Sequence, residues 1–233
     1  MSLRSPTAAT PEAGDLLGSA MHEFATRGLA PLFLHTARGD RFRLDLGRYF
    51  TSPAALDPDE RALLAMARGT VLDVGCGPAR HARYLQQRGL RALGLDRSPG
   101  ALAVARALGL RHALHADAMT APLPRGIGTA LLLDGNLGLA GSMHGTRRLL
   151  GRLAGACVPG GRLLVGGRAP AGATARRLAL RVEYRGAAGP WFAWLQLSLA
   201  GVIAVAAGTG WALESAVQRG PCYLICLHRN WSP

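Results

Sequence analysis

Three aspartates lie at or near the ends of apolar runs that have the length of a β-strand. Asp73 lies in "TVLDV", Asp96 ends "RALGLD" and Asp117 lies in "HADAM". The carboxyl ends of neighbouring parallel strands meet at one edge of a sheet, where open α/β folds bind their ligands. A carboxylate there can accept hydrogen bonds from hydroxyl or amino groups, or pair with a cation. The three residues therefore predict one ligand site that takes hydrogen-bond donors and positive charge.

A glycine-rich loop follows the first aspartate in "VLDVGCGPARH". Gly75 and Gly77 would allow a sharp turn and a close approach of the ligand to backbone amides, and Pro78 suits the first turn of a helix. Dinucleotide-binding loops carry G-x-G-x-x-G, but Arg80 stands at the third glycine position. Asp73 would repel a pyrophosphate and attract an ammonium or sulfonium group. The loop therefore argues against NAD and favours a ligand with positive charge nearby.

The other two aspartates suggest the rest of the ligand. Asp96 stands 21 residues after Gly75, where a carboxylate can bind both hydroxyls of a ribose. Asp117 can accept a hydrogen bond from an exocyclic amine, with the amide of Ala118 beside it. A cationic tail, a ribose and an aminopurine together describe S-adenosylmethionine. Structural roles remain open: Asp96 as a helix N-cap, Asp117 as a turn residue and Asp73 as a support for the loop.

At these residues the chain resembles the class I S-adenosylmethionine-dependent methyltransferases. The resemblance covers about residues 70–228 and rests on the series "VLDVGCG … GLD … HADA". It implies an α/β fold with a Rossmann-like sheet of seven strands, the last of them antiparallel. One departure is Ala79, where many members carry the third glycine of G-x-G-x-G. The resemblance implies that Gly75, Cys76 and Gly77 contact the methionine part, Asp96 the ribose, and Asp117 with Ala118 the adenine.

Methyl transfer from a sulfonium is an in-line displacement, which requires a positioned acceptor and a site that excludes water but no covalent nucleophile. We expect the acceptor beyond the fourth and fifth strands, where the fourth leads into "LLLDGNLGLAGSMHG". Asp134 and Asn136 could contact the cofactor or the acceptor there. His144 and His81 are candidate bases, with a surface or packing role as the alternative for each. This loop lacks the D-P-P-[YF] sequence of methyltransferases that act on nucleobase amino groups.

Two aromatic segments could enclose an acceptor of metabolite size. They are "GPWFAWLQ", with Trp191, Phe192 and Trp194, and "LGRYFTSP", with Tyr49 and Phe50. Packing in the core is the alternative for at least one of the tryptophan-segment residues. We expect a methyltransferase acting on a small organic acceptor. The rivals are an enzyme that methylates RNA or a protein, and a cofactor-binding protein without catalysis.

Alternating strand and helix patterns begin at residue 69 and indicate a parallel sheet covered by helices. We expect residues 1–14 to be disordered, 15–68 to form a helical cap and 69–233 to form the methyltransferase domain. An insertion at about 170–195 should form a small β-hairpin, and a closing hairpin should end the chain. The expected strands are 70–74, 91–95, 111–116, 128–133 and 162–166, and the expected helices are 78–88, 99–108, 143–157 and 195–208.

Composition adds few constraints. The net charge of +13 comes from arginine, since the chain has no lysine, and the arginines are scattered, so nucleic acid is disfavoured as a partner. The four cysteines form no C-x-x-C pair and lie in no histidine cluster, so we expect free thiols in a cytoplasmic protein, without a metal site or disulfides. Residues 186–213 lack charge, but prolines, glycines and polar residues interrupt them, so a membrane span is disfavoured. The oligomeric state stays open.

Overall fold

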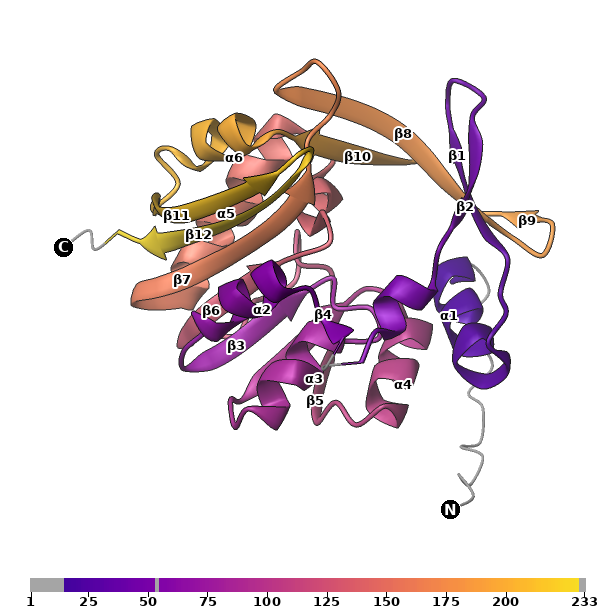
Figure 1. The fold of residues 1–233 in the computed structure, drawn as a ribbon, viewed down its shortest axis with the longest axis horizontal. Helices are drawn as coiled ribbons and strands as arrows, with labels where there is room; N and C mark the ends of the chain where they lie inside the picture. The colour runs from indigo at the N-terminus through magenta and orange to yellow at the C-terminus, as the bar shows by residue number, and fades with distance from the viewer. Residues whose placement is uncertain (1–14, 53–54, 231–233) are drawn as a thin grey trace.

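A mixed sheet of seven strands forms the centre of the protein (Figure 1). The computed structural model describes residues 15–52 and 55–230, so the expectation of disorder for 1–14 lies outside the described residues. The strand order is β11-β12-β7-β6-β3-β4-β5. These strands are β3 (Thr70–Val74), β4 (Ala92–Asp96), β5 (His112–His115), β6 (Ile127–Leu132), β7 (Cys157–Arg168), β11 (Trp211–Arg219) and β12 (Cys222–Arg229).

The strand directions agree with the sequence prediction. Strands β3 to β7 run parallel to one another, whereas β12 pairs antiparallel with both β7 and β11. The expected seven-stranded sheet with an antiparallel last strand is therefore confirmed. One boundary differs clearly: β7 starts at Cys157, five residues before the expected start at Arg162, because "VPGG" continues the strand with an irregular register against β6 instead of forming a loop.

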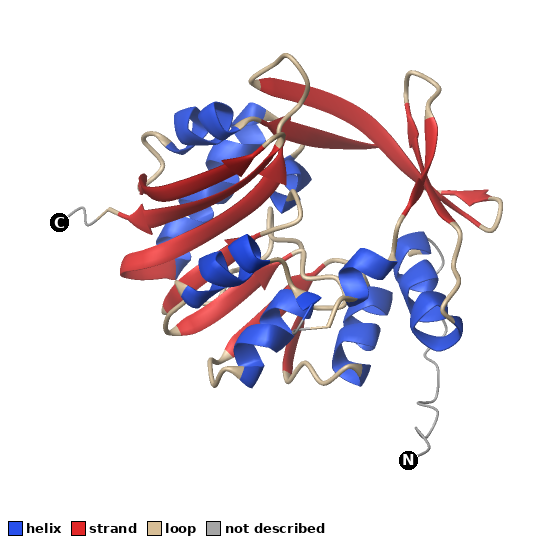
Figure 2. Ribbon diagram, in the orientation of Figure 1, coloured by secondary structure: helices blue, strands red, loops and turns tan. Residues whose placement is uncertain are grey.

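Helices cover both faces of this sheet (Figure 2). Alternate residues of β6 show the division, since Ala130 and Leu132 join a core cluster with helices α5 and α6, whereas Leu131 joins a second cluster with α2 and α3. This is the alternation that a strand with both faces buried requires. The helices are α2 (Pro58–Ala65), α3 (Arg80–Gln87), α4 (Pro99–Ala107), α5 (Met143–Ala156) and α6 (Leu199–Ala206).

The N-terminal region is only partly helical, which corrects the expectation for residues 15–68. Helix α1 (Leu16–Arg27) ends at Gly28, which adopts a left-handed conformation. The chain then forms strands β1 (Leu32–Thr36) and β2 (Arg41–Leu44), followed by the 3₁₀ turn η1 (Gly47–Phe50). The apolar spacing of "APLFLHTA" fits both a helix and a strand. Pairing with a strand far along the chain decides for the strand.

A second, antiparallel sheet joins this cap to the insertion after β7. Its order is β10-β8-β1-β2, with β9 beside β8, so the expected insertion hairpin is present but extends the cap strands. In Figure 1 it runs from the top of the main sheet across to α1. The insertion strands are β8 (Ala175–Tyr184), β9 (Ala187–Ala188) and β10 (Phe192–Leu197).

The uncharged segment contributes a strand and a short helix. The expected helix 195–208 is shorter in the structure, because β10 continues to Leu197 and the Ser198 side chain caps α6 by accepting from the Gly201 amide. Across the residues that the structure describes, no helix is long and apolar enough to cross a membrane.

Candidate functional site

The glycine loop makes a left-handed turn between β3 and α3. Gly75 and Gly77 have φ angles of 70° and 53°, as a sharp turn requires. Ala79 also has a positive φ, 60°, and is the N-cap of α3. A non-glycine residue in this region costs about 1–2 kcal/mol. The position at which this chain departs from G-x-G-x-G is therefore one at which glycine would be favoured.

The loop amides contact the protein itself, which differs from the expectation that they would meet the ligand. Gly75 and Cys76 donate from their backbone nitrogens to the Leu95 carbonyl, at 2.8 and 3.1 Å. Gly77 donates to Oδ2 of Asp96 at 2.8 Å. These bonds fix the loop against the end of β4. Burial also raises the pKa of the Cys76 thiol well above its usual value, so Cys76 stays a neutral, small loop residue.

Asp73 lies beneath the loop. Its side chain is 1% exposed and accepts from the Ala82 amide in the first turn of α3, at 3.3 Å. Burial raises the pKa of Asp73 to about 6, although His81 and the Ala82 amide favour the charged form. These contacts agree with a supporting role for Asp73, and its contact with a cationic ligand stays a prediction.

Asp96 and Asp117 both bind backbone amides at strand ends. Asp96 accepts from Gly77 through Oδ2 and from the Ser98 amide through Oδ1, at 2.8 and 2.9 Å, and burial raises its pKa. Each carboxylate oxygen has two lone pairs, so both can still accept from a diol. Asp117 is exposed and accepts from the Met119 amide at 2.7 Å, next to the buried Ala118.

Beside the loop, side chains from four segments form a network that we call the arginine–carboxylate network: Arg48, Glu60, Arg80, His81 and Asp134. Arg80 lies at its centre, donating to both oxygens of Glu60 at 2.9 and 3.2 Å and to both oxygens of Asp134 at 2.9 and 3.0 Å. Arg48 donates to Asp134 at 3.0 Å, and His81 bonds Glu60 at 2.8 Å. The network joins η1 and α2 of the N-terminal region to α3 and to the end of β6.

The network decides the charge state of Asp134. Burial opposes ionisation, but the electrostatic effect of His81, Arg80 and Arg48 outweighs it and lowers the pKa of Asp134. A carboxylate that two guanidinium groups bind and whose pKa is low is a weak proton acceptor. Asp134 is therefore better suited to fixing this strand end than to acting as a general base.

The remaining polar candidates, Asn136, His144 and His81, lie in three different environments. Asn136 donates from Nδ2 to the Val74 and Gly75 carbonyls, at 2.9 and 2.8 Å, so it fastens the β6 loop to the glycine loop. His144 is exposed on α5, as its alternative role as a surface residue requires. His81 is 5% exposed and belongs to the network.

The sequence drew attention to His81 and, as an argument against NAD, to Arg80, but it did not point to Arg48 or Glu60. Their side chains come from segments that only folding brings together. Neither an arginine in a turn nor a glutamate in the first turn of a helix signals such a role in the sequence.

The three aromatic candidates of the insertion differ in what they contact and in how exposed they are. A Cβ built at Gly138 would lie 2.5 Å from the Trp194 indole, so Trp194 packs directly on the turn after β6. Phe192 meets Trp194 edge to face, with ring centroids 6.4 Å apart. Trp191 is 49% exposed, and the Arg181 guanidinium lies over its ring, 4.9 Å from the centroid.

The two aromatic residues of η1 lie on the other side of the site. Phe50 contacts Phe24 of α1, with centroids 4.8 Å apart. Burial raises the pKa of Tyr49, and the charges of Arg48, Asp134 and Arg80 also act on this pKa, which places its hydroxyl near the network. Tyr49 therefore lies near the network, its contact with an acceptor stays a prediction, and Phe50 packs against α1.

Comparisons with known proteins agree with this geometry. Residues 71–161 match the model of a family described as "Methyltransferase domain". A methyltransferase from Bacteroides fragilis, solved in complex with S-adenosyl-L-homocysteine, is 24% identical and covers 96% of this chain and 98% of its own, with a TM-score of 0.84. Residues 71–161 therefore match a methyltransferase domain, and the chain has the fold of S-adenosylmethionine-dependent methyltransferases.

Other solved structures resemble this chain over a smaller share of its length. The CcbJ methyltransferase from Streptomyces caelestis is 17% identical and covers 78% of this chain and 93% of its own, with a TM-score of 0.61. CalS10, an amino pentose methyltransferase from Micromonospora echinaspora with S-adenosylmethionine bound, is 17% identical and covers 82% and 99%, with a TM-score of 0.57. No curated protein matches the sequence.

The site has the hydrogen-bond acceptors and the negative charge that S-adenosylmethionine requires. Asp96 keeps free lone pairs for ribose hydroxyls, and Asp73 adds negative charge beneath the loop. A Cβ at Gly75 would lie 2.8 Å from the Leu139 side chain and 2.9 Å from that of Asn136, so a side chain there would push apart the two loops that enclose the site. The residues present therefore fit S-adenosylmethionine.

Proposed function

We propose that this methyltransferase transfers the methyl group of S-adenosylmethionine to a small organic acceptor in the cytoplasm. The observation that carries the proposal is the hydrogen bond from the Gly77 amide to the Asp96 carboxylate, at the carboxyl edge of the sheet. It brings together the two sequence features that we assigned to the ribose and to the methionine part. The cytoplasmic location is supported by four free cysteines, as expected for a reducing compartment.

The size of the acceptor is inferred from what surrounds the loop after β6. Trp194 packs on Gly138 on one side, and Tyr49 lies near Asp134 from the cap. Trp194 pairs with Leu178 and lies on the same face of the second sheet as Tyr184, which packs with α1. An apolar wall of this kind suits a compact organic molecule. CalS10, whose acceptor is an amino pentose by its title, supports the same scale.

Catalysis would come mainly from position. The bound cofactor supplies an electrophilic methyl group, and the acceptor atom must lie in line with the bond that breaks. Asn136 and the network fix the loop that faces the acceptor, and the second sheet and cap would exclude water. Asp134, Asn136 and His144 remain candidates for contact with the acceptor.

Calorimetric titration with S-adenosylmethionine, S-adenosylhomocysteine and NADH tests the cofactor, with Asp96→Ala as the matched variant. We expect both adenosyl ligands to bind, NADH not to bind, and Asp96→Ala to lose binding. Binding of NADH alone, or of none of the three, would contradict the proposal. A screen of small acceptors for S-adenosylhomocysteine release then tests the reaction.

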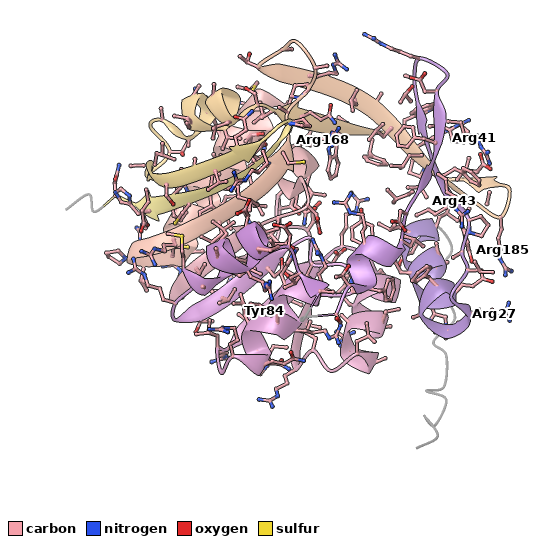
Figure 3. All side chains as sticks on the ribbon, in the orientation of Figure 1. Arg27, Arg41, Arg43, Tyr84, Arg168 and Arg185 are labelled. Atoms are coloured by element: carbon pink, nitrogen blue, oxygen red, sulfur yellow. The ribbon has the colours of Figure 1, made fainter. Side chains whose placement is uncertain are left out.

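The two rivals predict different results in the same assays. An RNA or protein acceptor would make turnover fall steeply with salt. Several exposed arginines already pair with acidic residues, such as Arg41 with Glu183 and Arg185 with Glu23, which makes them less available to an anionic acceptor. In Figure 3 both arginines lie on the side away from the main sheet. A binding protein without catalysis would bind the nucleoside tightly, show no turnover and tolerate Asn136→Ala.

A further inference from the structure

Asp15 links the first helix of the cap to the helix that follows β4. Its carboxylate caps α1 by accepting from the Gly18 amide at 2.9 Å. The same carboxylate accepts from the Ser98 hydroxyl at 2.8 and 2.9 Å and from the Gly100 amide at 2.9 Å. One side chain therefore satisfies the N-termini of two helices, α1 and α4, that are about eighty residues apart in sequence.

The Ser98 residue continues this contact toward the cofactor loop. Its hydroxyl accepts from the Ala101 amide, and its backbone amide donates to Oδ1 of Asp96. The other oxygen of Asp96 accepts from Gly77. A chain of hydrogen bonds thus runs from Asp15 through Ser98 and Asp96 to the glycine loop.

Helix α1 meets the same loop by a second route. Met21 is 3% exposed, and its Cε would lie 3.6 Å from a Cβ built at Gly77. The helix comes very close to α4, since a Cβ built at Gly100 would lie 2.9 Å from the Cα of Gly18. Because neither glycine leaves room for a side chain at this crossing, α1 has one position relative to the loop.

We propose that Asp15 is a positioning residue for the cofactor, which through Ser98 orients Asp96 and which docks α1 over the glycine loop. The inference rests on the proposed function, because the ligand that Asp96 receives is the adenosyl cofactor. Nothing in the sequence pattern of the loop points to this residue. Its role depends on contacts that the fold creates.

The charge of Asp15 gives the proposal a signature that a packing role lacks. Asp96 faces the carboxylates of Asp15 on α1 and Asp73 on β3, together with the Cys76 thiol of the loop. Burial raises the pKa of Asp96, and the negative charge of Asp15 raises it further. Removal of that charge lowers this pKa, so the loss of ligand affinity on acidification should move to lower pH.

The test is calorimetric titration of the full chain with S-adenosylhomocysteine between pH 5 and 8. It compares wild type, Asp15→Asn, Ser98→Ala and the double variant. Ser198→Ala is the control, because it removes an N-cap from α6 and has no contact with the loop. Thermal unfolding of each variant reports loss of stability separately.

We expect Asp15→Asn to weaken S-adenosylhomocysteine binding about tenfold at pH 7.5, the scale of one hydrogen bond to a charged group. The double variant should lose about as much as either single variant, because both act on Asp96 through one path. The acid limb of the binding curve should move to lower pH in Asp15→Asn. Ser98→Ala tests the same path if Asp15→Asn does not fold.

Three results would overturn the proposal. They are wild-type affinity in Asp15→Asn, losses that add in the double variant, and a loss that Ser198→Ala reproduces at equal loss of stability. Failure of wild type to bind S-adenosylhomocysteine would instead contradict the proposed function itself. The two failures are therefore distinguishable in one set of titrations.

Discussion

Asp134→Asn should destabilise the protein by removing one charge from the arginine–carboxylate network. The substitution keeps the shape of the side chain. It also keeps the backbone relaxed, because Asp134 has a φ of 55° and asparagine tolerates that left-handed region as well as aspartate does. The change therefore isolates the charge from strain, which Asp134→Ala would not do.

The magnitude follows from the exposure of the partners. The Asp134 and Arg80 side chains are 14% and 11% exposed, and breaking one partner of a buried pair costs about 3–5 kcal/mol. Arg80 keeps both bonds to Glu60, which lowers the cost, and the pair with the half-exposed Arg48 adds only about 0.5 kcal/mol. We expect a loss of about 2 kcal/mol in the free energy of unfolding at pH 7, or a Tm lower by about 4–8 °C.

The pH dependence has a defined sign. The network lowers the pKa of Asp134 in the folded protein, so its stabilisation is fully present above the unfolded pKa of about 3.9. It is lost as the pH falls through the lower folded pKa. Wild type should therefore lose its advantage over Asp134→Asn only in strong acid.

Urea unfolding measured from pH 7 down to pH 2.5 tests this prediction. Asp59→Asn is the control, because Asp59 pairs with the 76% exposed Arg219, and solvent screens such a pair so strongly that its loss should barely change stability. Equal stability of wild type and Asp134→Asn at pH 7 would refute the reasoning. So would a difference that stays constant throughout the acid range.

Three further results are expected. Gly75→Ala should lower the free energy of unfolding and weaken S-adenosylhomocysteine binding more than Gly109→Ala. Both glycines have a positive φ, but only at Gly75 would the added methyl group clash, 2.8 Å from a leucine side chain of the turn after β6. Equal losses of the two variants in denaturant unfolding and in calorimetry would contradict this. Trp194→Ala should reduce turnover of the acceptor at least tenfold and leave the affinity for S-adenosylhomocysteine unchanged. Trp191→Ala should change neither quantity. Equal effects of the two variants would show that Trp194 does not line the acceptor site. Affinity for S-adenosylhomocysteine, which carries an ammonium group, should rise as the pH increases through about 6, because the buried Asp73 ionises there. Asp73→Asn should flatten this rise. A pH profile that Asp73→Asn leaves unchanged would exclude a role for the charge of Asp73.

Much of the main sheet follows from local sequence. In "TVLDV" and "ALGLD" the apolar residues are continuous, as in strands buried on both faces, and the helix between them has its stop at Gly89. Strand positions therefore agree with the structure to within one residue for β3, β4 and β6. The number of strands, the antiparallel last strand and the resemblance to methyltransferases follow from the same motifs.

The cap could not be predicted in this way. The sequence "LFLHT" becomes β1 because Leu32 pairs with Tyr184 and Thr36 with Leu180, nearly 150 residues away. Periodicity over five residues cannot separate a helix from a strand when the deciding hydrogen bonds are so distant. The insertion hairpin was expected. Its pairing with the cap strand β1 was not, because the hydrogen bonds that join them also link distant parts of the sequence.

The sequence by itself determined the glycine loop and the acidic strand ends, and so predicted the cofactor, because each feature lies within one strand and the turn after it. Only the tertiary structure decided what the side chains do there. Arg48, Glu60, Arg80 and Asp134 form one network. Asp15 also reaches Ser98, and these contacts join residues that are 20 to 86 positions apart in the sequence. Such contacts arise from the packing of η1, α1 and α2 over the sheet edge, and no spacing along the chain records them.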